Sequence, residues 1–418
     1  MSKFVLPPIS TQYDERDIEF KYGEASPEIS HSLYDYLSTV KKQIESHNEI
    51  WDNIKKFTNP YEFIHGGVPG YKTPISKLKP LSRSFYKMIE IVHTFDIFPV
   101  VSNKENIFYN ADAAAVSVVA ADAAIKTFHL AEGPGGFIEA TAFLRKNSND
   151  MYYGMTLVSQ DPKCPGWKKS KQFLDDNENV FIEVGSDGTG NLLSMENYNH
   201  CYNNYRETMD VITGDAGIDF SDNYNKQENM ALKLIIAQVL YAITMQKNNG
   251  HFILKVFDTF TTSSIDILYL LSSLYKEVYI TKPKTSRYAN SEKYIVCKFF
   301  KLNQQKHNFY NIIKGLIRNF EFLLQSHADD EICNILRFNV DYKFKVCVEE
   351  INAIIGKTQI EIITKTLNLI YNKGVPHCDK IDAYKNINIL KCINWCEKYN
   401  IPYYKTLQAV NIFLKQRT

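Results

Sequence analysis

Short apolar runs alternate with helical patterns between Phe128 and Lys301. Each run is flanked by Gly, Pro, Asn or Asp, and this composition predicts strands bounded by turns. Strands that alternate with helices are typical of a parallel sheet with crossover helices. The last two runs are joined by KTSRYANSE, which is too short for a crossover helix, so we expect them to pair antiparallel at one edge. The seven predicted strands are FHLAE, YYGMTLV, NVFIEVG, MDVITGD, HFILKVF, EVYITKP and KYIVCKFF.

Different patterns flank this region on both sides. Residues 1–80 combine polar, helix-like stretches with the Gly- and Pro-rich segment HGGVPGYKTP, which indicates an irregular, partly helical platform. Beyond Lys301, apolar residues at helical spacing predict an all-α appendage. We therefore expect a platform over residues 1–80, an α/β domain over 81–301 and a helical appendage over 302–418. The α/β domain should hold a Rossmann-like sheet of six parallel strands and one antiparallel edge strand.

Composition narrows the setting but not the function. The eight cysteines of the 418 residues lack the spacing of a disulfide framework and follow no apolar leader, which favours a reducing compartment such as the cytoplasm. No apolar run reaches the roughly 18 residues that a membrane-spanning helix needs, so no membrane association is expected. The formal net charge of +1 means that any nucleic-acid binding must come from local basic patches.

A glycine-rich turn follows the first predicted strand, in FHLAEGPGGF. Gly133, Gly135 and Gly136 would let a ligand approach the backbone closely at the carboxyl end of the sheet, where such folds bind ligands. The spacing is not that of the dinucleotide motif, and Pro134 removes an N–H that a phosphate would use. S-adenosylmethionine (AdoMet), which has no phosphate, suits the turn better. The alternative is a turn whose glycines only serve close packing.

Four ionisable residues are candidates for catalysis. Asp215 ends a predicted strand, Lys255 lies inside an apolar strand, Glu292 opens the last strand and Lys87 lies on a helix before the sheet. A buried lysine needs a carboxylate partner, and a carboxylate at a strand end faces the ligand crevice. Taken singly, the four could instead be a helix N-cap, an edge-strand lysine, a solvated turn and an exposed helix lysine.

Taken together, the four residues fit the transfer of a methyl group to a ribose hydroxyl. The hydroxyl must lose its proton, and an unperturbed lysine is protonated at neutral pH. A neighbouring ammonium and partial desolvation lower a lysine pKa, while flanking carboxylates orient the side chain. We assign Lys255 as general base and Lys87 as a second cation that steers the hydroxyl. Asp215 and Glu292 would orient the two lysines, and Asp215 would lie nearest the transferred methyl group.

The order of these motifs resembles the FtsJ-like methyltransferase family, in particular the branch that methylates the first transcribed nucleotide of capped mRNA. The similarity covers roughly Trp51 to Lys301 and is carried by NPYEFI, EGPGGF, YGMTL, GSDGTGNL, GDAG, GHFILKVFDTFT and KPKTSRYANSEKYIVCK. The segments DNYNKQENMALKL and ITKPKTSRYANSEKYIVCK are also similar to a methyltransferase of African swine fever virus and its relatives. A large cytoplasmic DNA virus is therefore a plausible source, with the host cytoplasm as the place of action.

The resemblance implies a class I AdoMet-dependent fold, capped mRNA as substrate and other capping enzymes as partners. It also implies roles for residues that composition alone would not select. The expected cofactor contacts are Ser82, Ala131, Glu132, Gly133, Pro134, Gly135, Gly136, Phe137 and Asp187. The expected RNA contacts are Lys55, Asn225, Lys226, Gln227 and Asn290, with Arg287 available from the same loop as Asn290.

Other interpretations stay open at this point. The same four residues could serve a ribosomal or transfer RNA methyltransferase, and the chain could also be a catalytically silent RNA-binding scaffold of a capping complex. The run KCPGWKKSK could stack on RNA or form a solvated loop. His377, Cys378, Cys392 and Cys396 match no standard zinc spacing, so core packing is expected there and no metal site.

Overall fold

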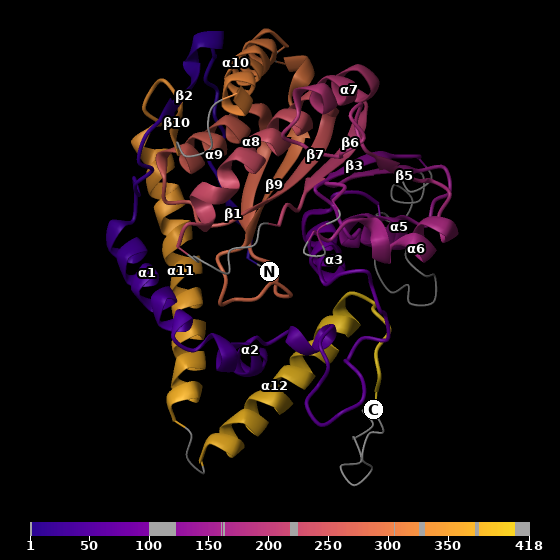
Figure 1. Cartoon of the computed structure of the whole chain (residues 1–418), viewed down its shortest axis with the longest axis vertical. Helices are drawn as coiled ribbons and strands as arrows, with labels where there is room; N and C mark the ends of the chain where they lie inside the picture. Colours follow the sequence, from indigo (N-terminus) through magenta and orange to yellow (C-terminus); the bar gives the residue numbers. More distant parts are fainter. Residues whose placement is uncertain are drawn as a thin grey trace, which may run out of the picture.

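The core of the protein is a single eight-stranded sheet with helices on both faces (Figure 1). The computed structural model describes residues 2–99, 123–159, 161, 164–217, 225–304, 306–325, 331–372 and 376–405. The strand order is β1-β8-β9-β7-β6-β3-β4-β5. These strands are β1 (Phe4–Val5), β3 (Lys126–Leu130), β4 (Met151–Met155), β5 (Val180–Glu183), β6 (Met209–Gly214), β7 (Gln246–Val256), β8 (Tyr275–Thr281) and β9 (Lys293–Phe300).

The predicted six parallel strands and one reversed strand are confirmed. Strands β3 to β7 pair in parallel, and β9 runs antiparallel to both β7 and β8, so β8 has the same direction as β7 and is the sixth parallel strand. The reversed strand is not outermost as expected, because β8 lies beyond it and the two-residue β1 pairs with β8. The continuous burial of β9 from Tyr294 to Cys297 explains this placement, since a strand without a polar face is stable only inside a sheet.

Alternate residues of the central strands pack into two separate hydrophobic cores, one on each face of the sheet. Phe252 and Leu254 of β7 face the core beneath α7, α8, α9 and α10, whereas Ile253 faces the core beneath α3, α5 and α12. The sheet therefore forms the middle layer between two helical layers. The helices of these layers include α3 (Ser84–Phe95), α5 (Gly136–Arg145), α7 (Met195–Tyr205), α8 (Gln227–Met245), α9 (Thr262–Leu274) and α10 (Lys306–Gln325), whereas the short α6 (Lys171–Asp176) has no buried residue.

The amino-terminal and carboxyl-terminal segments are built around each other. Figure 1 shows the indigo helices α1 (His31–Glu45) and α2 (Asn48–Thr58) beside the long helices α11 (Tyr342–Tyr371) and α12 (Pro376–Lys398). Strand β2 (Ile18–Tyr22) pairs antiparallel with β10 (Ile332–Leu336), a strand that the expected all-α appendage did not include. Its partner lies more than 300 residues away, so no local pattern reveals it. The boundaries at residues 80 and 301 stay a prediction.

Two further features complete the fold. Short 3₁₀ turns lie at η1 (Glu15–Asp17), η2 (Glu62–Ile64), η3 (Trp167–Lys169) and η4 (Leu302–Gln304). Within the described ranges, α8 alone has the length and apolar composition of a membrane-crossing helix. Because 78% of that stretch is buried inside the protein, core packing accounts for its apolar sequence.

Helix α12 supports the helix that carries Lys87. Trp395 packs edge-on against Tyr86 of α3, with ring centroids 5.7 Å apart, and Asn388 Nδ2 donates to the carbonyl of Phe57 at 2.7 Å. Cys392 and Cys396 are buried in this core, as the packing interpretation predicts, whereas the side chains of His377 and Cys378 lie outside the described residues. The appendage is thus part of the scaffold of the site.

We expect Trp395→Ala to lower the free energy of unfolding by about 3–5 kcal/mol, because it leaves a cavity between α12 and α3. Leu390→Ala on the same helix is the control, since Leu390 is 62% exposed and should change stability little. Denaturant unfolding followed by circular dichroism measures both. Equal stability of the two variants would show that α12 does not support α3.

Candidate active site

The four predicted catalytic residues meet at the carboxyl ends of β6 and β7. Asp215 directly follows β6, Lys255 is the penultimate residue of β7, Glu292 directly precedes β9, and Lys87 lies in the first turn of α3. Lys87 Nζ lies 2.7 Å from Glu292 Oε1, and Lys255 Nζ lies 3.2 Å from Asp215 Oδ1. The structure therefore places two lysine–carboxylate pairs together from four separate segments of the chain.

The alternatives that assigned these residues to solvated surface positions or to a helix N-cap are wrong. Lys87, Lys255 and Glu292 are each at most 8% exposed, so none is a solvated surface residue. Lys226, not Asp215, is the N-cap of α8. Because ionised side chains are buried only with partners, the pairing explains how Lys255 on β7 and Lys87 on α3 are both buried.

Tyr294 joins the two ion pairs into one network. Its hydroxyl donates to Asp215 Oδ1 at 2.8 Å and accepts from Lys87 Nζ at 3.4 Å. Sequence reasoning missed this residue because an aromatic residue in an apolar strand usually indicates core. The spacing from Glu292 to Tyr294 was the available signal, since residues two apart on a strand share a face.

Electrostatics favour the ionised form of Glu292 and the protonated form of Tyr294. Burial opposes the ionisation of Glu292, but the charges of Lys87 and Lys255 outweigh it and hold the Glu292 pKa below its usual range. Burial raises the pKa of Tyr294 well above 10, so its hydroxyl keeps its proton and remains a donor. Ser286 Oγ donates to Glu292 Oε1 at 2.6 Å and adds to the stabilisation of the carboxylate.

The glycine-rich turn is held tightly by the protein itself. Glu132 Oε1 accepts from the backbone N–H groups of Phe137 and Ile138 at 2.7 and 2.9 Å, so this carboxyl group caps α5, and burial raises its pKa to about 8. A Cβ atom on Gly136 would lie 2.2 Å from Ser82 Oγ. Close packing is therefore one reason for the glycines, and it places Ser82 against the turn, while the contact of Ser82 with the cofactor stays a prediction.

The surroundings of this turn also fit a nucleoside-like cofactor. Ala131 has a left-handed φ of +52°, a strained conformation that clusters at ligand sites. The loop that contains Asp187 reaches the same place, because Val158 N donates to Thr189 O at 2.7 Å. Leu157 and Val158 are 45% and 54% exposed, so apolar surface lies beside the loop that carries Asp187. The carboxylate of Asp187 accepts from Thr189 N at 2.8 Å, which orients it within its loop.

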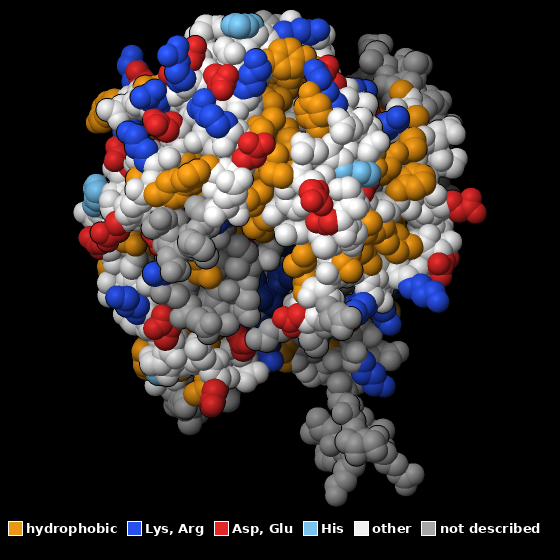
Figure 2. Space-filling model, turned by 45° about the horizontal axis from the view of Figure 1, so that its top comes forward, with side chains coloured by type: hydrophobic (Ala, Val, Ile, Leu, Met, Phe, Trp, Pro, Cys, Tyr) orange, Lys and Arg blue, Asp and Glu red, His pale blue; other side chains and the backbone are white. Residues whose placement is uncertain are grey.

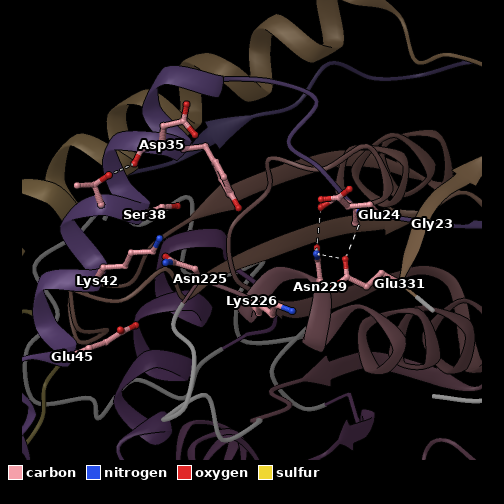
Figure 3. Close-up of a pocket in the computed structure, with 13 residues that line it drawn as sticks. Gly23, Glu24, Asp35, Ser38, Lys42, Glu45, Asn225, Lys226, Asn229 and Glu331 are labelled. Atoms are coloured by element: carbon pink, nitrogen blue, oxygen red, sulfur yellow. Dashed lines mark hydrogen bonds between the residues drawn. The ribbon is translucent and has the colours of Figure 1, made fainter. Parts of the chain in front are cut away.

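The residues expected to touch RNA fall into two groups. Asn225 and Lys226 line a groove of about 1010 Å³ between α1 and the start of α8, where Figure 3 shows Asn225 close to Lys42 and Ser38 and Lys226 pointing away from them. Figure 2 shows a hollow near the middle of the molecule with Lys or Arg side chains deep inside it. The lining of the groove is Gly23, Glu24, Ala25, Tyr34, Asp35, Ser38, Thr39, Lys42, Glu45, Asn225, Lys226, Asn229 and Glu331.

The other expected RNA contacts bond to the protein itself. Lys55 pairs with Asp52, and Arg287 places Nη2 2.8 Å from Glu62 Oε1. Gln227 accepts from Ser291 Oγ, and Asn290 Oδ1 accepts from Lys282 Nζ at 3.0 Å. These four side chains are thus oriented by the protein itself, and their contact with RNA stays a prediction. In the run KCPGWKKSK, Lys163 lies outside the described residues, while Trp167 packs over Gly154 and Gly135.

The comparison with protein families covers the region that builds this site. Residues 80–300, more than half of the chain, match the family model described as FtsJ-like methyltransferase. The chain belongs to the FtsJ-like methyltransferase family.

Curated relatives of this FtsJ-like methyltransferase include proteins named cap-specific mRNA (nucleoside-2′-O-)-methyltransferase 1. The mouse protein is 30% identical over 280 residues, which cover 63% of this chain and 30% of the relative. The Dictyostelium discoideum protein is 29% identical over 325 residues, covering 72% and 39%. The human protein is 31% identical over 265 residues, covering 58% and 28%. The FtsJ-like methyltransferase thus spans about a third of the length of these relatives.

We expect Glu292→Gln to destabilise this FtsJ-like methyltransferase by about 3 kcal/mol at pH 7, because it leaves the buried Lys87 without its carboxylate. The pKa of Glu292 is depressed in the folded state, so its contribution is present above its unfolded pKa, near 4.5, and is lost as pH falls below that. The stability gap between wild type and variant should therefore narrow towards pH 4. Urea unfolding at both pH values measures the gap.

Glu196→Gln on α7 is the control for this experiment, because Glu196 is exposed and carries no such pairing. A gap that is absent at pH 7, or that widens in acid, would contradict the assignment of Glu292 as a buried carboxylate of the network.

Proposed function

We propose that this protein transfers the methyl group of AdoMet to the ribose 2′-hydroxyl of the first transcribed nucleotide of capped mRNA. The supporting observation is the buried network in which Lys87–Glu292 and Lys255–Asp215 are linked by Tyr294. The names of the curated relatives support the choice of the capped substrate. Transfer to ribosomal or transfer RNA would use the same network and differs only in the RNA that docks.

AdoMet would supply a methyl group on a positively charged sulfur atom. Residues 131–137 and Ser82 would form one wall of its crevice, and Asp187 would offer a carboxylate to hydroxyl donors. Leu157 and Val158 would give apolar surface to a ring system. The residues that surround the turn thus match the chemistry of a nucleoside with a charged side chain.

Lys255 is the residue we assign to proton removal. Its Nζ donates to the backbone carbonyl of Asp215 at 3.0 Å and lies 3.2 Å from Asp215 Oδ1, so two contacts fix its direction. Lys255 would accept the proton of the ribose hydroxyl in its neutral form, and Asp215 would keep the resulting ammonium in place.

Lys87 and Glu292 would orient the hydroxyl from the opposite side. Glu292 holds the Lys87 ammonium at 2.7 Å, and the hydroxyl of Tyr294 keeps Lys87 and Asp215 at a fixed separation. A rigid cation beside the reacting oxygen stabilises the negative charge that develops as the proton leaves.

The setting of the reaction belongs to the same proposal. We place the protein in the cytoplasm, in a host cell if the source is viral, on the scattered cysteines and the sequence resemblance alone. Association with other capping enzymes would supply the capped RNA. Asn225 and Lys226 in the groove are the residues we assign to the RNA chain next to the methylated nucleotide.

We expect Lys255→Met to reduce methyl transfer by roughly 10³-fold or more, because general-base catalysis contributes 10²–10⁴-fold and the lysine also orients the hydroxyl. Binding of S-adenosylhomocysteine should stay within about twofold of wild type in calorimetry, since Lys255 acts on the hydroxyl. Lys247→Met at the other end of β7 is the control, because Lys247 pairs with Asp210 away from the site. Turnover like that of wild type would refute the base assignment.

We also expect capped RNA to accept label from radiolabelled AdoMet faster than uncapped RNA of the same sequence, with the label on the first transcribed nucleotide after nuclease mapping. Capped and uncapped transcripts that differ only at the 5′ end form the matched pair. Equal rates, or label at internal positions, would favour a ribosomal or transfer RNA substrate.

A further inference from the structure

Lys282 closes the loop that leads into the active site. This loop, residues 282–292, connects β8 to β9 and is called the β8–β9 loop below. Lys282 Nζ donates to the Asn290 carbonyl at 2.7 Å, to Asn290 Oδ1 at 3.0 Å and to the Glu292 carbonyl at 2.6 Å. An ammonium has three N–H donors, so these contacts within its own loop use all three.

The near half of the loop is held separately, by α3. Glu90, one turn after Lys87, accepts from the N–H groups of Lys284 and Thr285 at 2.9 and 2.7 Å. Arg83 Nη2 donates to the Thr285 carbonyl at 2.9 Å. Because Lys87 reaches Glu292, three side chains touch the β8–β9 loop along one stripe, two from α3 and one from its N-cap Arg83.

In the far half of the loop, residues 289–292, Lys87 holds the Glu292 side chain, but Ala289 and Ser291 have only neutral anchors. Gln359 Nε2 donates to the Ala289 carbonyl at 3.1 Å, and Ser291 Oγ bonds to Gln227. Lys282 adds a charged donor that binds Asn290 and Glu292 at once. Hydrogen bonds from a charged donor are stronger than neutral ones, so Lys282 is the strongest hold on the backbone of this half, while Lys87 holds the Glu292 side chain.

These contacts decide how Asn290 meets a substrate. A lysine can only donate, so the amide oxygen of Asn290 must face Lys282, and its amide NH₂ becomes the group that can donate outward. The same ammonium fixes the Glu292 backbone, from which the side chain reaches Lys87. The Lys282 ammonium thus fixes both the orientation of the Asn290 amide beside the active site and the position of Glu292 in the catalytic network.

We propose that Lys282 is a positioning residue for RNA, which holds the amide of Asn290 towards an oxygen of the RNA and Glu292 towards Lys87. This inference rests on the proposed function and extends it to a residue that touches neither cofactor nor reacting atoms. It predicts a defect in RNA binding with AdoMet binding intact.

The electrostatics of Lys282 supply a second readout. Burial lowers its pKa to about 7; the charges of Lys293 and Lys87 act in the same direction, while Glu292 and Asp258 oppose them. As pH rises through about 7, the ammonium loses one donor and its charge, so its hold on the loop weakens. The KM for RNA in the wild type should therefore increase from pH 6 to pH 8.

The experiment compares Lys282→Met and Lys282→Arg with Lys298→Met as the matched control. Lys298 lies on β9 and donates to the Phe95 carbonyl, far along the strand from the β8–β9 loop. We expect Lys282→Met to raise the Kd for capped RNA and the KM on the order of tenfold, the loss of about one charged hydrogen bond. S-adenosylhomocysteine affinity should stay within twofold, and Lys298→Met should leave RNA binding unchanged.

Lys282→Arg keeps the charge at every pH, so it should restore most of the RNA affinity and remove the pH dependence of KM. If Lys282→Met fails to fold, the test is the KM for RNA of the arginine variant, measured at pH 6 and pH 8 and compared with the wild type. RNA affinity that is unchanged in Lys282→Met, or a pH dependence that persists in Lys282→Arg, overturns the inference. Wild-type protein that binds RNA without transferring methyl groups overturns the proposed function instead, while the affinity comparison still tests Lys282.

Discussion

The burial of two lysines at the carboxyl ends of the parallel strands is the main constraint on this structure. Lys87 and Lys255 are each buried against a carboxylate, and the two carboxylates come from different parts of the chain, Asp215 after β6 and Glu292 before β9. Because β6 and β7 are parallel, Asp215 and Lys255 lie at the same end of the sheet. Because β9 is antiparallel to β7, Glu292 and Tyr294 at its start lie at that end too. This geometry places two lysines and two carboxylates of opposite charge next to each other in one network.

The outer segments of the chain serve the same arrangement. Lys87 belongs to α3, which is covered by α12 through Trp395 and is tied to the β8–β9 loop through Glu90. The pairing of β2 with β10 and the packing of α1 and α2 on α11 and α12 join both ends of the chain. Lys87 therefore lies on a helix that is fixed on several sides, as preorganised electrostatic catalysis requires.

Much of this could be predicted from the sequence, because the strong signals are local. The seven strands of the α/β domain followed from apolar runs and turn residues, and Lys255 stood out as a lysine inside an apolar strand. The position of β9 between β7 and β8 was not predicted, because its pairing on both edges depends on burial over the whole sheet. Strand β10 was missed since its partner β2 is distant in sequence.

In the site, too, features within one sequence motif could be predicted, whereas contacts between distant segments could not. The four ionisable residues were selected from their places in single motifs and from the resemblance, but their distances depend on the fold. Tyr294 and Lys282 escaped notice because a tyrosine in a strand and a lysine before a proline are ordinary on their own. Their roles arise from contacts across the β8–β9 loop, which no pattern along the chain records.

The most direct measurement is a structure of the protein with S-adenosylhomocysteine and a capped oligonucleotide. The account predicts the 2′-oxygen of the first transcribed nucleotide at hydrogen-bond distance, about 3 Å, from Lys255 Nζ, with Lys87 on its other side. A bound RNA whose 2′-oxygen lies away from both lysines, with the ion pairs undisturbed, would contradict it.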